Sequence, residues 1–268
     1  MLANYHTHST FCDGKNTPEE IVRYSIENGF DAIGFSGHGY TPHDLRYCMK
    51  DTEGYIAEIK KLKDKYKNKI QIYLGVEEDA FSHVNRADFD YIIGSCHYYL
   101  ADGTHYPIDS NFDYFKRCLE VFKYDAVRMA ESYYGFFCDY IARRKPDVVG
   151  HYDLITKFDE VDEVQRFLNN PEYLEVAEKY TREVMKTDVI FEINTGAISR
   201  GFRKMPYPQE PLLKIIRDNG GKVALGSDSH TVETLDYYFK ESKKYLSDLG
   251  FENVYVLYDG EWKKDCIK

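Results

Sequence analysis

The chain has 268 residues and a formal net charge of −10, because 45 acidic side chains outnumber 35 basic ones. This acidic balance argues against a nucleic-acid partner, which would call for a basic face. No apolar run of about 18 residues is present, and the first residues lack the basic and apolar segments of a signal peptide, so we expect no membrane partner.

Short apolar strands alternate with helical segments along the chain. We predict strands at residues 2–5, 32–36, 70–76, 91–95, 147–149, 189–193 and 223–226, and a closing strand at 254–258. Helices are expected at residues 18–28, 52–67, 171–186, 211–219 and 234–249, with two more inside 111–143. The first helix has the clearest start, because Thr17 can cap it, Pro18 suits its first position and Glu20 can complete a capping box.

This alternation is typical of parallel strands joined by helical crossovers. The length fits one domain over residues 1–268, since an α/β barrel takes about 250 residues. We therefore predict a distorted, TIM-like (β/α)7 barrel. An open doubly wound sheet is the alternative, but it would not bring so many strand ends to one point.

Residues with metal-ligand chemistry follow these strands. His6 and His8 end the first strand, and their spacing puts both imidazoles on one face of an extended chain. The later positions are Asp13, His38, Glu77, His97, His151, Asp228 and His230. A buried histidine satisfied by hydrogen bonds explains any one of them, but not the recurrence of six of the nine histidines at strand ends. Asp13 precedes a glycine and could equally be a turn residue.

Histidine and carboxylate ligands without cysteine indicate Zn²⁺, Mn²⁺ or Fe²⁺. Nine ligands exceed the needs of one tetrahedral ion, so we expect two or three ions. Ions set close together can clamp the attacking and leaving oxygens of a phosphoryl transfer. The residues therefore predict metal-dependent hydrolysis, with phosphate esters favoured. An amide or ring hydrolase of the amidohydrolase type is one alternative, and a binding module with a decayed metal site is another.

Seven short motifs resemble those of the polymerase and histidinol phosphatase (PHP) superfamily, in the same order. They are HTHS at 6–9, DG at 13–14, SGH at 36–38, GVE at 75–77, SCH at 95–97, GHYDL at 150–154 and GSDSH at 226–230. The resemblance implies a distorted (β/α)7 barrel with three metal ions at the carboxyl ends of its strands. Some relatives have histidine where Asp13 stands, and Glu78 is the neighbouring alternative to Glu77.

The resemblance also implies how the ligands are shared among the ions. His6, His8 and Glu77 would hold one ion, with Asp228 nearby. Glu77 would bridge to a second ion held by His97 and His151. Asp13, His38 and His230 would complete the third position.

Two longer stretches resemble the histidinol-phosphate phosphatases of this superfamily, namely SCHYYLADGTHYPID from residue 95 and EINTGAISRGFRKMPYPQEPLL from residue 192. They imply hydrolysis of L-histidinol phosphate, a small phosphate monoester, to L-histidinol and phosphate by a hydroxide that bridges the ions. A PHP phosphoesterase acting on a nucleotide, a sugar phosphate or phosphotyrosine is the nearest alternative.

The same resemblance suggests substrate contacts. Arg200 would bind the phosphate, because a planar, permanently charged fork suits an anion, and Lys157 and Arg203 are further candidates. The candidates for contact with the imidazole or amine are Tyr98, Tyr99, Asp102 and Tyr207. The candidates for protonating the leaving oxygen are Asp13, Asp228 and His230.

The remaining polar residues are assigned no chemistry. His43, His83 and His105 are expected in loops, with His105 near the pocket mouth. The six cysteines show no paired CxxC spacing, which favours reduced thiols in a cytoplasmic protein.

Overall fold

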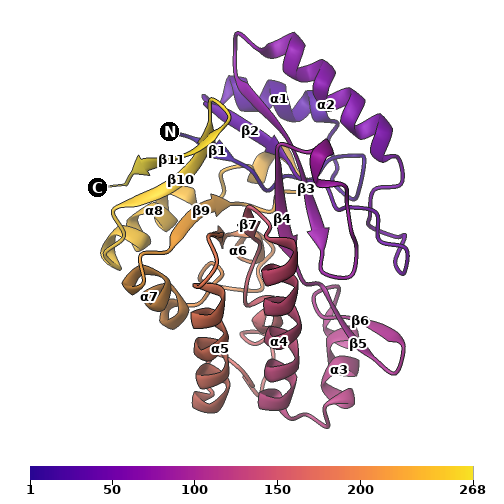
Figure 1. The fold of residues 1–268 in the computed structure, drawn as a ribbon, viewed down its shortest axis with the longest axis vertical. Coiled ribbons are helices and arrows are strands. Elements are labelled where there is room, and N and C mark those ends of the chain that lie inside the picture. Colours follow the sequence, from indigo (N-terminus) through magenta and orange to yellow (C-terminus); the bar gives the residue numbers. More distant parts are fainter. Residues whose placement is uncertain (268) are drawn as a thin grey trace.

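A computed structural model describes residues 1–267 and contains a seven-stranded parallel sheet that curves into a nearly closed barrel (Figure 1). The strands lie in the order β1 (Ala3–Asn4), β2 (Ala32–Phe35), β3 (Gln71–Asp79), β4 (Tyr91–Ser95), β7 (Val148–Val149), β8 (Ile190–Asn194) and β9 (Lys222–Gly226). The predicted TIM-like barrel of parallel strands is therefore confirmed, and each predicted strand of the barrel is present within a few residues.

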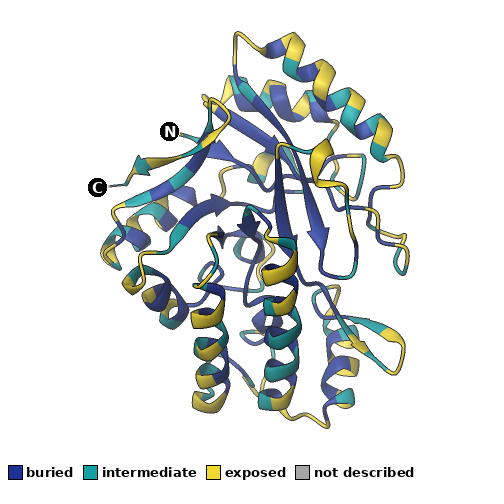
Figure 2. Ribbon diagram, in the orientation of Figure 1, coloured by how far each residue is buried: buried dark blue, intermediate teal, exposed yellow. Residues whose placement is uncertain are grey.

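Helices surround the barrel, and the longer ones expose one face each (Figure 2). They are α1 (Pro18–Glu27), α2 (Thr52–Tyr66), α3 (Phe112–Val121), α4 (Ala126–Arg144), α5 (Pro171–Val184), α6 (Gly196–Ser199), α7 (Glu210–Asp218) and α8 (Phe239–Asp248). Short 3₁₀ turns occupy Arg86–Asp88, Leu154–Thr156 and Val232–Thr234. The capping box predicted for α1 is present, with Thr17 and Glu20 each bonded to the other's backbone N–H.

The seam between the first and last barrel strands is narrow. Thr7 and Ser229 form an isolated parallel bridge just beyond β1 and β9. The backbone N–H of His8 donates to the Ser229 carbonyl at 2.8 Å, and the Ser229 N–H donates to the His6 carbonyl at 3.2 Å. The barrel therefore closes among the candidate metal ligands themselves.

The closing strand predicted at 254–258 is present, but it lies outside the barrel sheet. These residues belong to β10 (Asn253–Tyr258), which pairs with β11 (Glu261–Cys266) in a separate antiparallel hairpin. Its turn is Asp259-Gly260, where both residues have positive φ values of 52° and 78°, as in the tight turns that suit hairpins.

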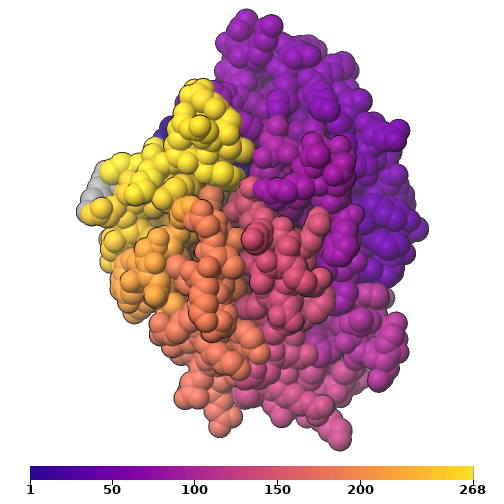
Figure 3. All heavy atoms as spheres, in the orientation of Figure 1, coloured from indigo at the N-terminus to yellow at the C-terminus, as the bar shows by residue number. Residues whose placement is uncertain are grey.

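This C-terminal hairpin plugs the amino-terminal end of the barrel. Val256 and Leu257 pack in one buried cluster with Tyr5 and Tyr91, and the Tyr5 hydroxyl donates to the Leu257 carbonyl at 2.7 Å. Trp262 covers the same rings, 5.3 Å from the Tyr5 ring centroid. Figure 3 shows the yellow C-terminal segment seated against the purple first half of the chain.

Two further elements differ from the sequence prediction. A second hairpin, β5 (Tyr98–Ala101) and β6 (Thr104–Pro107), was not predicted, although its turn is also an Asp-Gly pair. Helix α8 begins at Phe239 instead of residue 234, because the preceding Tyr238 has a left-handed backbone with φ of 64°.

The six cysteines are all free thiols, as expected. Among residues 1–267, no helix combines the length and the apolar character needed to cross a bilayer.

Candidate metal centre

The nine candidate ligands converge at the carboxyl ends of the barrel strands, where parallel strands place their chemistry. Glu77 lies within β3, and the other eight follow β1, β2, β4, β7 and β9. Seven of the nine are buried, whereas Asp13 and His230 face the opening. The structure therefore brings together every residue proposed as a ligand.

Glu77 stands at the middle of the group. Its Oε1 atom lies 3.0 Å from His151 Nε2 and 3.3 Å from His97 Nε2. Its Oε2 atom lies 2.8 Å from His38 Nδ1 and 3.3 Å from His6 Nε2. Burial opposes ionisation, but the rings of His6 and His38 hold the pKa of Glu77 well below its usual value. Its two oxygens face different imidazoles, which is the arrangement a bridging carboxylate needs.

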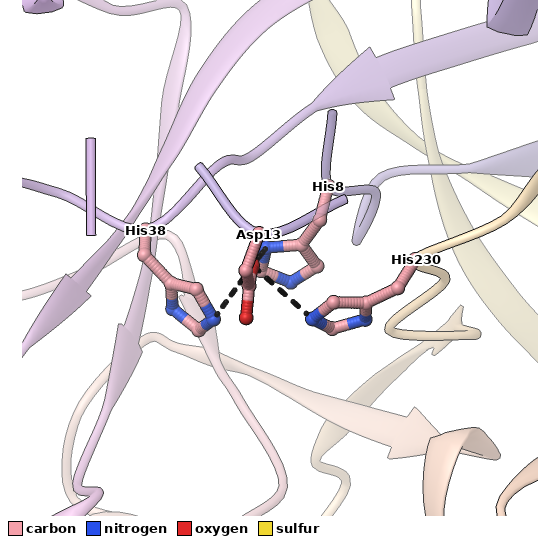
Figure 4. A group of neighbouring side chains, drawn as sticks. All are labelled: His8, Asp13, His38 and His230. Atoms are coloured by element: carbon pink, nitrogen blue, oxygen red, sulfur yellow. Dashed lines mark ion pairs between the residues drawn. The ribbon is translucent and has the colours of Figure 1, made fainter. Parts of the chain in front are cut away.

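Asp13 lies at the outer side, with three imidazoles around its carboxylate (Figure 4). Its Oδ1 atom is 3.4 Å from His230 Nε2, 3.7 Å from His38 Nε2 and 3.8 Å from His8 Nδ1. Burial lowers the pKa of His8 to about 3, and the neighbouring His230 and His38 add to this effect. A neutral imidazole is the form that binds metal.

Asp228 lies between the rings of His6 and His8 and the guanidinium of Arg200. Its Oδ1 atom lies 3.2 Å from His8 Nε2 and 3.7 Å from His6 Nε2, while its Oδ2 atom accepts from Arg200 at 2.7 Å. The backbone of Asp228 has φ of 49°, a left-handed conformation that aspartate adopts more readily than most residues with a side chain.

The donor set fits divalent cations. Four groups of ligand atoms each lie within 4.8 Å of one another: His8–Asp13–His38–His230, His6–Glu77–His151, His6–His8–Asp228 and His38–Glu77–His97. The buried atoms His6 Nε2, His8 Nε2 and Glu77 Oε2 make no hydrogen bond with the described residues. A buried polar atom left unpaired costs about 1–3 kcal/mol, and coordination of a cation would satisfy all three. These groups differ from the assignment of ligands to ions that the resemblance implies. The resemblance puts His6 and His151 on different ions, whereas the structure places them in one group with Glu77.

Two buried carboxylates that the sequence analysis missed contact the Nδ1 atoms of His6 and His97. Glu192 Oε1 lies 2.6 Å from His6 Nδ1, and Asp79 Oδ2 lies 3.1 Å from His97 Nδ1. Both belong to barrel strands, β8 and β3. A carboxylate inside an otherwise apolar run is the signal that could have identified Glu192, whereas Asp79 follows two other acidic residues at the end of β3 and has no such signal.

A cavity of about 370 Å³ opens beside the ligands. Its lining includes the ligands Asp13, His38, His97, Asp228 and His230, the cations Arg46, Lys157 and Arg200, the carboxylates Asp44 and Asp109, and the rings of Tyr47 and Tyr98. Lys157 donates to the Asp109 carbonyl at 2.6 Å, and burial lowers the pKa of its ammonium although Asp109 opposes this. The cavity thus combines candidate ligands with cations, carboxylates and aromatic rings, and each of the two carboxylates pairs with a cation, Asp44 with Arg46 and Asp109 with Lys157.

Comparison with known proteins agrees with this architecture. The model of the PHP domain family matches residues 4–196. The chain belongs to the PHP domain family. A curated relative from Schizosaccharomyces pombe, named "Probable histidinol-phosphatase", is 26% identical over 284 residues, covering 97% of this chain and 90% of the relative. A "Histidinol-phosphatase" from Lactococcus lactis is 26% identical over 273 residues, covering 94% of this chain and 92% of the relative.

A solved PHP structure shares the fold. The crystal structure of histidinol phosphate phosphatase from Lactococcus lactis, complexed with zinc, L-histidinol and phosphate, aligns with a TM-score of 0.67. It is 19% identical, and the match covers 98% of this chain and 99% of that one. At this identity the likeness supports the barrel fold.

Two of the three candidate phosphate contacts line the cavity, and the third does not. Arg200 and Lys157 line the cavity, whereas Arg203 does not. The Arg203 side chain is only 2% exposed, and its Nε lies 3.2 Å from Glu160 Oε1. Its guanidinium packs 4.8 Å from the ring centroid of Tyr207, which is buried and also outside the cavity lining.

Of the other candidate substrate contacts, Tyr98 lines the cavity, whereas Tyr99 and Asp102 do not. Tyr98 lines the cavity and donates to Asp44 Oδ2 at 3.1 Å. Tyr99 instead pairs its hydroxyl with Ser132, and Asp102 is exposed at the turn of the β5–β6 hairpin.

The three histidines outside the motifs lie in loops or in this hairpin. His83 is exposed on a loop, and His43 stacks on His105 of β6 with 3.8 Å between ring centroids. His105 also lies 6.2 Å from the ring of Tyr98, a cavity residue.

Proposed function

We propose that the protein is a metal-dependent phosphatase that hydrolyses L-histidinol phosphate to L-histidinol and phosphate. The observation that carries the proposal is one cavity lined by five of the nine clustered ligands, by three cations and by two further carboxylates. The names of the two curated relatives, and the zinc, L-histidinol and phosphate bound in the Lactococcus lactis structure, support the same reaction for this chain.

In this proposal the cluster holds two or three ions of Zn²⁺, Mn²⁺ or Fe²⁺. His6, His8, Asp13, His38, Glu77, His97, His151, Asp228 and His230 would be their ligands. When bound, such ions activate water and offset the charge of a phosphoryl group. We also propose a small-molecule substrate, a single domain and a cytoplasmic location, in keeping with the net charge of −10 and the free cysteines.

The phosphate would be bound by Arg200 and Lys157. Both cations line the cavity beside Asp228 and are held by acceptors, Arg200 by the Asp228 carboxylate and Lys157 by the Asp109 carbonyl. Their positions are therefore set before the substrate arrives. Charge-assisted hydrogen bonds of this kind are stronger than neutral ones, and the fixed guanidinium fork can take two phosphate oxygens.

The imidazole and amine would meet the acidic and aromatic part of the cavity. Arg46 lowers the pKa of Asp44 to about 2, so Asp44 is ionised at neutral pH. The Tyr98 hydroxyl donates to Asp44, and the Tyr47 ring lines the same cavity, whereas the second carboxylate, Asp109, lies 3.6 Å from Lys157 Nζ. A cationic amine attached to an aromatic ring suits these groups, whereas a polyanionic nucleotide does not.

The leaving alkoxide would need a proton. Asp13, Asp228 and His230 remain the candidates for this transfer, and all three line the cavity. Asp13 and His230 face each other at 3.4 Å, so a proton shared by this pair would lie at the open side of the centre.

A phosphate-release panel tests the proposal. Enzyme loaded with Zn²⁺ or Mn²⁺ is assayed with histidinol phosphate, an aryl phosphate, a nucleotide, a sugar phosphate and phosphotyrosine. We expect kcat/KM for histidinol phosphate to exceed all others by at least about tenfold, a difference of about 1.4 kcal/mol. An equal value for the aryl phosphate would favour another PHP phosphoesterase. Metal-loaded protein that releases no phosphate from any of them would contradict phosphatase activity altogether.

A further inference from the structure

One buried carboxylate binds to two parts of the candidate centre at once. Glu192 lies in β8 and is 2% exposed. Its Oε1 atom is 2.6 Å from His6 Nδ1, and its Oε2 atom accepts from the His151 backbone N–H at 2.9 Å and from Asn194 Nδ2 at 3.0 Å. His6 and His151 follow different strands, β1 and β7, so the carboxylate joins separate parts of the barrel rim.

The contacts of both carboxylate oxygens suit a histidine that binds metal through Nε2. Oε2 faces two N–H donors, and Oε1 faces a ring nitrogen that carries a proton if His6 binds metal through Nε2. A glutamine would place an NH₂ group where one oxygen accepts, so it would either lose a contact or donate to His6 Nδ1 and favour the tautomer protonated at Nε2. With His6 protonated at Nδ1, Glu192 Oε1 accepts from the ring and the Nε2 lone pair faces Glu77, 3.3 Å away.

The neighbouring strand leaves space for this carboxylate. A Cβ atom built on Gly226 of β9 would lie 1.9 Å from Glu192 Oε1. Any side chain at position 226 would therefore displace Glu192. The absence of a side chain at Gly226 and the three hydrogen bonds are independent features of the chain that place the same oxygen atoms.

We propose that Glu192 is a positioning residue that fixes His6 and His151 as metal ligands within the His6–Glu77–His151 group. Glu192 acts through these two residues and would not itself be a ligand. The inference rests on the proposed metal centre but not on the identity of the substrate. Asp79, by comparison, contacts one candidate ligand, His97, through both its ring and its backbone N–H.

The test measures metal binding, not turnover. Glu192→Gln and Gly226→Ala disturb the same carboxylate by different means, one by chemistry and one by volume. Glu78→Gln is the matched control, because Glu78 is equally buried in β3 but bonds to Arg144 and Tyr140. Each purified protein is titrated with Zn²⁺ against a competing chelator, and its Co²⁺ form is followed by visible absorption.

We expect Glu192→Gln and Gly226→Ala each to lower the affinity of one ion by about 10- to 100-fold, the usual effect of losing a group that supports a ligand. Their Co²⁺ spectra should change, while Glu78→Gln should keep wild-type affinity within about threefold and an unchanged spectrum.

Three outcomes are distinguished. Wild-type affinity and spectra in both test variants would overturn the role of Glu192. Affinities that follow the thermal stability of the metal-free proteins across all three variants would also overturn it, because Glu192 would then be merely structural. A wild-type protein that binds no Zn²⁺ would instead refute the proposed metal centre.

Discussion

Arg200→Ala separates substrate binding from metal binding. Arg200 donates to Asp228 Oδ2 at 2.7 Å and to the Asp228 carbonyl at 3.1 Å, and its side chain is 34% exposed in the cavity. A hydrogen bond to a charged group contributes about 1.5–3 kcal/mol, and the exposed third of the side chain favours the lower part of that range. A loss of about 2 kcal/mol corresponds to a fall of about 30-fold in kcat/KM.

The assay pairs steady-state kinetics on histidinol phosphate with metal analysis. Arg46→Ala is the control, because Arg46 lines the same cavity but is 64% exposed and contacts Asp44 and the ring of Tyr114, so we expect a change below about threefold. His97→Ala should lose metal as well as activity. The reasoning would be refuted if Arg200→Ala kept the wild-type kcat/KM, or if it lost as much metal as His97→Ala.

Two further substitutions test the cavity and the fold. Burial lowers the pKa of Lys157 below its ordinary value of 10.5, so kcat/KM should decline as pH rises through that lowered pKa. Lys157→Arg keeps its charge and should abolish this alkaline decline in a pH–rate profile; a decline unchanged in the variant would exclude Lys157. Trp262→Ala should lower the free energy of unfolding by about 2 kcal/mol, below the about 3–5 kcal/mol of a fully buried ring. Denaturant unfolding checks this, and an accompanying loss of metal affinity would contradict our placement of Trp262 at the end of the barrel away from the ligands.

The barrel could be predicted because its strands are buried on both sides and are separated by helices with their own signals. Ala32 and Ile33 of β2, for example, point to opposite faces and pack in different buried clusters, so the strand is a continuous apolar run. Strand β10 has a similar composition, and its local sequence does not indicate whether it joins the barrel sheet or packs against the end of the barrel. That choice depends on the rings of Tyr5 and Trp262, which lie far apart in sequence.

The ligand cluster was predictable for a related reason. Parallel strands end at one rim, so a polar residue just after an apolar run has a known location even when its partners are distant. Glu192 escaped this rule because it lies inside its strand. Arg203 illustrates the opposite limit: it is three residues from Arg200, but its partner Glu160 draws the side chain into the core and away from the cavity. Sequence spacing indicates which residues reach the rim, but not which way each side chain turns.

The contacts that close the barrel also bring the candidate metal ligands together. The seam between β1 and β9 depends on the Thr7–Ser229 bridge, whose hydrogen bonds involve the backbones of His6 and His8. Ser229 itself lies between Asp228 and His230. The same bridge therefore brings together ligands from both ends of the sequence, and His8 Nε2 comes to 3.2 Å from Asp228 Oδ1. An ion held by His6, His8 and Asp228 would join the two strands through their side chains where few backbone bonds do so, which is why we expect bound metal to stabilise this seam more than any other part of the barrel.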